Sequence, residues 1–240
     1  MKTTIKVIGD IFVEQLKWSW WFMGINLLIH LSLSYYSVKY GFGISDFTQF
    51  ISAAVSIYML VIGIVAGSSF LNYYSRLGVT RKDYFYGVAI AAIILSFTII
   101  IVADVLAFIE ISIFNMINVS LKSNIFVGMN WVKPTFSISL NGLIYYLIGW
   151  FISVGYYKFN WKAGLLFILI SFVFSSIHGF VWVDHFIDIP GLITGSTMEE
   201  IININAGQLS YGVSAAVDAG LIVFLLFVLR GLTKSVSVKL

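Results

Sequence analysis

The sequence predicts an all-α fold: a polytopic membrane protein with six transmembrane helices, preceded by an interfacial amphipathic helix. Hydrophobic residues make up 60% of the 240 positions and charged residues 10%, whereas soluble domains average about a quarter charged residues. Six long apolar stretches fill most of the chain. A helix needs roughly 20 such residues to cross about 30 Å of hydrocarbon. These observations exclude a water-soluble protein.

The apolar stretches are continuous, and they lack the alternating pattern of a barrel wall. Helices are the other fold that satisfies every backbone group in lipid. No repeat or linker is evident, so residues 1–240 are expected to form a single transmembrane domain. Two outer connections, 114–137 and 186–208, are long enough for short helices or re-entrant segments. The spans are expected near Trp18–Val38, Phe47–Asn72, Phe85–Ile113, Ile138–Tyr157, Gly164–Val183 and Leu209–Leu229.

Residues 3–17 are expected to form the helix that lies flat at the cytoplasmic interface. Seen at about 100° per residue, one side of this helix is apolar and the opposite side is charged. Trp18, Trp20 and Trp21 would anchor it at the depth of the lipid headgroups. Both a topological anchor and a surface for a cytoplasmic partner fit this pattern. The apolar side holds Ile5, Ile8, Phe12 and Leu16, and the charged side Lys6, Asp10, Glu14 and Lys17.

Basic residues set the expected orientation, because they accumulate on the cytoplasmic side. Only Lys39, Lys122 and Lys133 fall outside if both termini are cytoplasmic. The last outer loop carries four acids and no base. The N- and C-termini are therefore both expected in the cytoplasm. The cytoplasmic bases are then Lys2, Lys6, Lys17, Arg76, Arg81, Lys82, Lys158, Lys162, Arg230, Lys234 and Lys239, and the acids of the last loop are Asp184, Asp188, Glu199 and Glu200.

Small residues four apart indicate close helix packing in two spans. Gly63 and Gly67 have this spacing in the second span, and Gly212, Ala216 and Gly220 have it in the sixth. Packing within one subunit and association with a second subunit both fit this spacing.

Three acids fall inside expected spans and form a candidate substrate path: Asp104, Glu110 and Asp218. A charge at the bilayer centre costs about 2.5–3.5 kcal/mol on insertion scales. Each acid could therefore be a neutral group that fixes helix packing, or could meet a substrate or proton. His30 and His178 lie in polar stripes that indicate hydrogen bonding between helices, and no metal site is expected.

Enzyme motifs are missing from the sequence, so no catalytic residues are expected. There is no H-E-x-x-H, no G-x-S-x-G and no P-loop, so this chain cannot bind ATP through such a loop. Glu199-Glu200 resembles the paired glutamates of CAAX-type membrane proteases, but Ile204 stands where that motif has Arg. The chain also has no cysteine.

The segment Tyr73–Tyr84, between the second and third spans, carries more structure than a positive-inside loop requires. Gly78 permits a turn, and Thr80 is positioned to cap a short helix that Arg81 and Lys82 open. A short helix that projects from the membrane would suit docking to a soluble motor protein.

Within this segment, Arg76-Leu77-Gly78-Val79-Thr80-Arg81-Lys82-Asp83-Tyr84 resembles a loop of the membrane subunits of ABC-2-type (ATP-binding-cassette) exporters. The resemblance implies a coupling helix that sits on an ATPase subunit. That partner would bind ATP and Mg, and this chain would bind no cofactor. It also implies a second membrane subunit, identical or different, in a bacterial cytoplasmic membrane. The implied docking residues are Tyr74, Arg76, Gly78, Thr80, Arg81, Lys82 and Tyr84.

The small size and aromatic-rich spans are similar to the membrane subunits of bacterial peptide and bacteriocin-immunity exporters, including those that export phenol-soluble modulins. This likeness implies export of amphipathic, membrane-active peptides. A stand-alone channel, secondary transporter or peptide-immunity protein without an ATPase is the alternative. That alternative predicts that the intramembrane acids matter more than the cytoplasmic segment.

Overall fold

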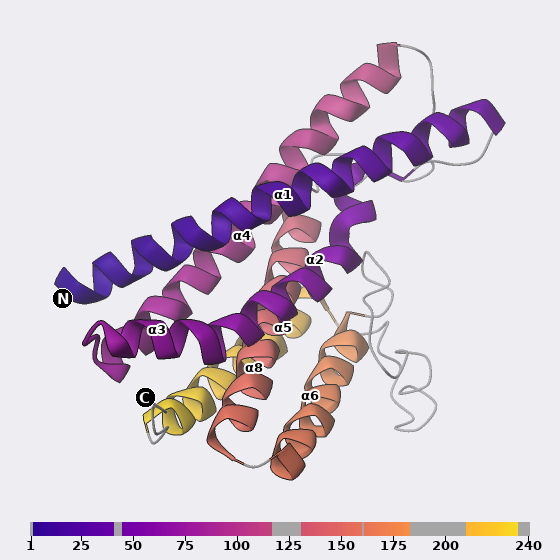
Figure 1. The fold of residues 1–240 in the computed structure, drawn as a ribbon. Helices are drawn as coiled ribbons and strands as arrows, with labels where there is room; N and C mark the ends of the chain where they lie inside the picture. Colours follow the sequence, from indigo (N-terminus) through magenta and orange to yellow (C-terminus); the bar gives the residue numbers. More distant parts are fainter. Residues whose placement is uncertain (1, 41–44, 117–130, 160, 183–209, 235–240) are drawn as a thin grey trace.

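This computed structural model describes residues 2–40, 45–116, 131–159, 161–182 and 210–234, and in these parts the protein is built from α-helices that short turns connect (Figure 1). A π-helical turn, η1, joins α2 to α3, so that these elements form one 30-residue rod from Phe47 to Arg76. The helices are α1 (Lys2–Tyr40), α2 (Phe47–Val65), η1 (Ala66–Phe70), α3 (Leu71–Arg76), α4 (Arg81–Met116), α5 (Val132–Lys158), α6 (Trp161–Val181) and α8 (Tyr211–Lys234).

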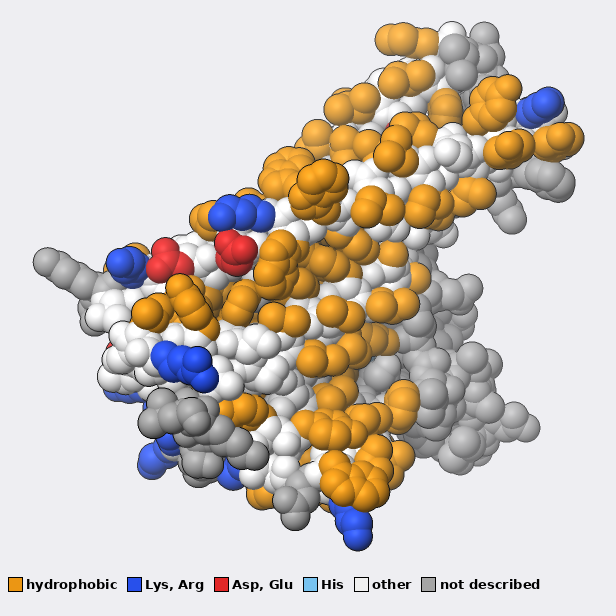
Figure 2. Space-filling model, in the orientation of Figure 1, with side chains coloured by type: hydrophobic (Ala, Val, Ile, Leu, Met, Phe, Trp, Pro, Cys, Tyr) orange, Lys and Arg blue, Asp and Glu red, His pale blue; other side chains and the backbone are white. Residues whose placement is uncertain are grey.

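Five of the rods in the described part of the chain are long and apolar enough to cross a membrane: Phe47–Arg76, α4, α5, α6 and α8. This finding is compatible with the multi-pass membrane protein that the composition predicts. Helix α1 is not among the five, because tryptophan, serine and other polar residues interrupt its apolar stretch. Hydrophobic side chains cover most of the face shown in Figure 2, whereas acidic side chains stand out near the N-terminal end of α1.

Helix α1 differs from the sequence expectation, since the separate segments 3–17 and 18–38 are one uninterrupted helix of 39 residues. Ile5 is 62% exposed, whereas Val7, Ile11 and Gln15 are buried. Phe12 and Leu16, from the predicted apolar side, are partly buried and pack against the core. Gln15 is buried although it is polar, and its side-chain amide donates to the Tyr146 hydroxyl (2.8 Å).

Helix α5 is the central element of the fold. Most of its length, from Pro134 to Gly155, is buried, and it packs against α2, α4, α6 and α8. A helix that is apolar on every side is typical of a fully buried position. Helices α2, α4, α6 and α8 therefore pack around α5, whereas α1 packs against α4 and α2.

Rods α2 and α5 approach so closely that glycine is needed on both. A Cβ atom on Gly63 would overlap the carbonyl oxygen of Tyr146, and one on Gly149 would overlap that of Leu60. The Gly63–Gly67 motif is thus used for packing within the chain. The α8 motif is different, because a Cβ on Gly212 or Gly220 would meet no atom within 4 Å.

Several helices begin or end at residues other than those expected from the sequence. Helix α5 begins at Val132, so the last part of the expected connection 114–137 is helical. Pro134 is tolerated there because the first turn of a helix has no internal partner for its backbone N–H groups. Residues 114–116 belong to the end of α4. Residues 117–130, and the connection 186–208 with Glu199 and Glu200, lie outside the described residues.

Candidate functional site

The connection between α3 and α4 is a four-residue turn with defined hydrogen bonds. Gly78 has φ of +79°, a conformation that only glycine adopts without strain. Its N–H donates to the Ser75 carbonyl (3.1 Å), and the Val79 N–H donates to the Tyr74 carbonyl (3.0 Å). This is the double hydrogen bond of a Schellman motif, which ends a helix. The expected turn at Gly78 is therefore confirmed.

Thr80 caps the helix that follows, as expected. Its hydroxyl accepts a hydrogen bond from the Asp83 N–H (3.1 Å) and donates to the Asp83 carboxylate (2.7 Å). The expectation of a short helix is wrong, however. Arg81 is the first residue of α4, which continues without a break to Met116, because an apolar stretch follows the cap directly.

Side chains near this turn join it to the first and last helices. The Thr4 hydroxyl of α1 donates to Asp83 (2.6 Å). The Arg81 guanidinium donates to the Lys234 carbonyl at the end of α8 (2.9 Å). Arg230 of α8 also lies over the ring of Phe85, 5.4 Å from its centroid. A force on the α3–α4 turn would therefore reach α1 and α8 directly.

The docking residues expected in this segment divide into an exposed and a buried group. Arg76, Gly78, Thr80 and Lys82 are exposed, and Arg81 is half-buried. Tyr74 is buried. Tyr84 is also buried, and its hydroxyl donates to the Ala66 carbonyl in the π-helical turn. In this conformation Tyr84 supports the turn from inside, and Tyr74 lines the groove beside it.

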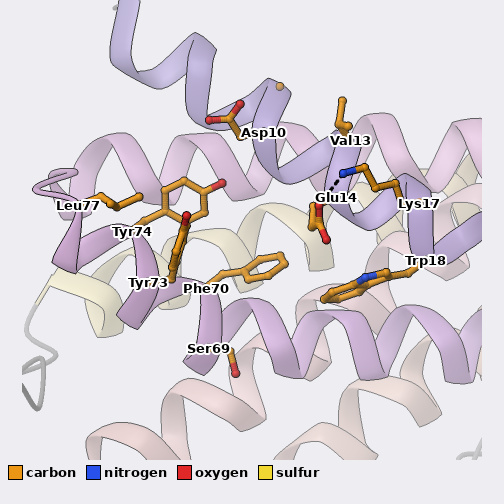
Figure 3. Close-up of a pocket in the computed structure, with 11 residues that line it drawn as sticks. Asp10, Val13, Glu14, Lys17, Trp18, Ser69, Phe70, Tyr73, Tyr74 and Leu77 are labelled. Carbon is orange, nitrogen blue, oxygen red and sulfur yellow. Dashed lines mark hydrogen bonds and ion pairs between the residues drawn. The ribbon is translucent and has the colours of Figure 1, made fainter.

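A groove of about 740 Å³ opens beside the turn, between α1 and the η1–α3 segment (Figure 3). Asp10 and Glu14 lie on its α1 side, and Phe70, Tyr73 and Tyr74 lie on its η1–α3 side. Glu14 is paired with Lys17 at 3.1 Å. The α1 side of the groove carries Asp10, Glu14 and Lys17, the opposite side is aromatic, and the groove adjoins the basic turn. Sequence analysis assigned Asp10 and Glu14 to a solvent-facing side but gave no indication of the opposite aromatic wall.

The expected intramembrane acid Glu110 pairs with a histidine of α1. Nε2 of His30 lies 2.7 Å from one carboxylate oxygen of Glu110. The other oxygen accepts a hydrogen bond from the Phe47 N–H at the start of α2 (3.1 Å). Both side chains of the pair are buried. The pair thus joins α1, α2 and α4.

Asp218 is enclosed by a second histidine. Nδ1 of His178 lies 2.8 Å from one of its carboxylate oxygens, and the Trp182 indole donates to the other (2.7 Å). His178 and Asp218 are at most 1% exposed. Asp218 of α8 is thus joined to His178 of α6.

Asp104 has a different environment. Its two carboxylate oxygens accept hydrogen bonds from the hydroxyls of Thr48 (2.9 Å) and Thr135 (2.7 Å). It also borders a groove of about 660 Å³ between α4 and α5, whose other lining is almost entirely apolar. Asp104 and Glu110 thus both contact the start of α2, through the adjacent residues Thr48 and Phe47. Asp218 lies at another contact, between α6 and α8.

No group of three or more potential metal ligands occurs in the residues that the structure describes. The two histidine–carboxylate pairs were not predicted, because their members are 80 and 40 positions apart in the sequence. One signal could have found them: each histidine and its acid lie between the middle and the outer end of their expected spans. No family model, curated protein sequence or solved structure matches the chain.

Proposed function

We propose that this protein is the membrane subunit of an ATP-binding-cassette exporter of the ABC-2 type, powered by a separate ATPase subunit. The observation that carries the proposal is the α3–α4 turn. It exposes Arg76 and Lys82, has a backbone fixed by caps, and is joined by side chains to the first and last helices. Such an element can pass a partner's movement into the helices it joins.

The proposal includes six spans, with α1 as the sixth. Contacts between α1 and α4 run in parallel from Thr4–Asp83 to His30–Glu110. At 1.5 Å per residue, the stretch of α1 between these contacts is about 39 Å long, and a bilayer core is about 30 Å thick. If α4 crosses the membrane, α1 crosses beside it. The interfacial helix then becomes the first turns of this same rod, at the cytoplasmic surface.

Both termini are proposed to be cytoplasmic. Thr4, the α3–α4 turn and Lys234 lie at one end of the molecule, as their hydrogen bonds require. Bases are concentrated in the connections at this end, which is the pattern of the cytoplasmic side of bacterial membrane proteins. We therefore place the protein in the bacterial cytoplasmic membrane.

The docking surface in this proposal has both signs of charge. Arg76 and Lys82 are exposed at the turn, and Asp10 and Glu14 line the adjoining groove (Figure 3). Charge complementarity of this kind orients a partner and speeds encounter. Closure of two ATPases would move the two turns of a dimer of membrane subunits, and the helices would open a path for an amphipathic peptide.

Charge reversal at the turn tests the docking role. The double variant Arg76→Glu, Lys82→Glu should lose most of the P-loop ATPase that co-purifies with the tagged wild-type chain, and should lose stimulated ATP turnover. The matched control is Lys158→Glu, Lys162→Glu, which makes the same charge change at the α5–α6 connection. If both double variants retain the ATPase, or if no ATPase co-purifies with the wild-type chain, the exporter assignment is wrong.

The buried histidine–carboxylate pairs favour a second candidate, a secondary transporter or channel without an ATPase. Intramembrane ionisable residues mark ion or proton paths in many such proteins. That function predicts that transport by the purified chain in vesicles follows the proton gradient and needs no ATP. The enclosure of Asp218 by His178 and Trp182 gives it a structural role instead, which is why we place this candidate second.

A further inference from the structure

The groove between α4 and α5 has the size and composition of a small-molecule site. Its volume is about 660 Å³, and such sites have volumes of roughly 300–1,000 Å³ with few polar groups. The rings of Phe97, Phe108, Trp131 and Phe136 supply most of the wall. Asp104 is the only ionisable group among the residues that line it.

Asp104 is also the one buried acid of the described spans that has no imidazole beside it. Glu110 and Asp218 each lie within 2.8 Å of a histidine nitrogen. The partners of Asp104 are two neutral hydroxyls, and no basic group in the described ranges lies within ion-pair distance of it. A buried carboxylate is costly unless a positive charge pairs with it.

We infer that this groove binds a lipophilic cation, whose charge faces Asp104 and whose apolar body packs on the aromatic rings. Faces of aromatic rings attract cations in addition to making apolar contact. The outer wall is open, since Ile101, Val105 and Phe108 are 52%, 55% and 63% exposed. A ligand dissolved in the membrane could therefore enter from the side. The inference names a ligand class for the proposed exporter, and rests on that function only for the ligand's transport.

Equilibrium dialysis of the full chain in detergent, with whatever subunit accompanies it, tests this inference. The probe is tetraphenylphosphonium, and the matched control ligand is tetraphenylborate, which has a similar shape and the opposite charge. We expect saturable binding of the cation only. In Asp104→Asn the dissociation constant should rise by about tenfold or more, because one ion pair of about 1.4 kcal/mol corresponds to a factor of ten.

Ile101→Trp supplies a second variant that leaves Asp104 intact. Its larger side chain would fill the groove from the exposed wall and should also weaken binding by about tenfold or more. This variant decides the question if Asp104→Asn does not yield a monodisperse protein. The inference is wrong if tetraphenylphosphonium shows no saturable binding, or if the two ions bind equally well. It is also wrong if the dissociation constant of the cation is unchanged in both variants.

The outcome is separate from that of the docking test. Binding that depends on Asp104, in a chain that brings down no ATPase, would leave the cation site standing and remove the exporter. Docking of an ATPase on the α3–α4 turn, without saturable cation binding, would support the exporter and remove the cation site.

Discussion

Asp218 and Asp104 are both buried carboxylates, but the first closes a polar cluster and the second borders an open groove. Asp218 is 1% exposed and contacts His178 and Trp182. Asp104 has two threonine partners and adjoins a large cavity. A carboxylate whose partners are complete has a structural role. A carboxylate that lacks a positive partner and faces a cavity is suited to bind a ligand. Four predictions test this contrast and its counterparts elsewhere in the molecule.

Removal of His178 should have the largest effect on stability. His178→Phe leaves Asp218 buried with Trp182 as its remaining partner. The free energy of unfolding should fall by about 3–5 kcal/mol, as when one member of a buried pair is lost. Reversible unfolding in mixed micelles measures this. The double variant His178→Phe, Asp218→Leu should recover much of the loss. A single variant as stable as the wild type would remove the structural role of the pair.

The next largest effect should be the difference in stability between alanine at a tightly packed glycine and alanine at an open one. A Cβ on Gly149 would overlap the Leu60 carbonyl, and a Cβ on Gly220 would meet nothing within 4 Å. Gly149→Ala should lower the free energy of unfolding by about 1–3 kcal/mol. Gly220→Ala should leave it unchanged or slightly higher, because alanine is the better helix former. Equal losses from both would show that the α8 stripe is packed in the protein as purified.

Thr80→Ala should destabilise the start of α4 by about 1 kcal/mol, since the Asp83 N–H then loses its cap. Thr80→Ser keeps the hydroxyl and is the matched control. Hydrogen exchange of the amides at the start of α4 measures the local effect. Faster exchange in the serine variant as well would mean that the methyl group of Thr80, and not its hydroxyl, stabilises the turn.

Asp104→Asn should change stability least. One threonine hydroxyl can still donate to the amide oxygen, and the other can accept a hydrogen bond from the amide NH2 group. The free energy of unfolding should therefore change by less than about 1 kcal/mol. Thermal unfolding in detergent measures the change. A loss as large as that of His178→Phe would show that Asp104 is also a closed structural acid, and the contrast between the two regions would fail.

Local features of the fold could be predicted from the sequence, because neighbouring residues determine them. The apolar stretches predict membrane helices, and the described part of the chain has five helices long and apolar enough to cross a membrane. Gly78 and Thr80 predict a turn and a cap, and both are present. These rules depend on a few adjacent positions and on the chemistry of one residue.

Features that depend on distant residues could not be predicted. Val7 is buried because Gly87 of α4 leaves room for it. The buried amide of Gln15 has its partner 131 positions away. The aromatic wall opposite Asp10 and the threonines around Asp104 likewise come from other helices. Tertiary packing selects among many possible pairings, and a helical pattern read along one segment does not specify its partners.

Because α1 contacts α4 at both Thr4 and His30, the number of residues between these two contacts is constrained. Thr4 pairs with a residue 79 positions later, and His30 with one 80 positions later. Deleting one residue near Gly24 would rotate the distal half of α1 by about 100° and shorten it by about 1.5 Å. His30 would then point away from Glu110, while Thr4 stayed beside Asp83. This stretch of the gene should therefore accept many exchanged codons but few added or lost ones.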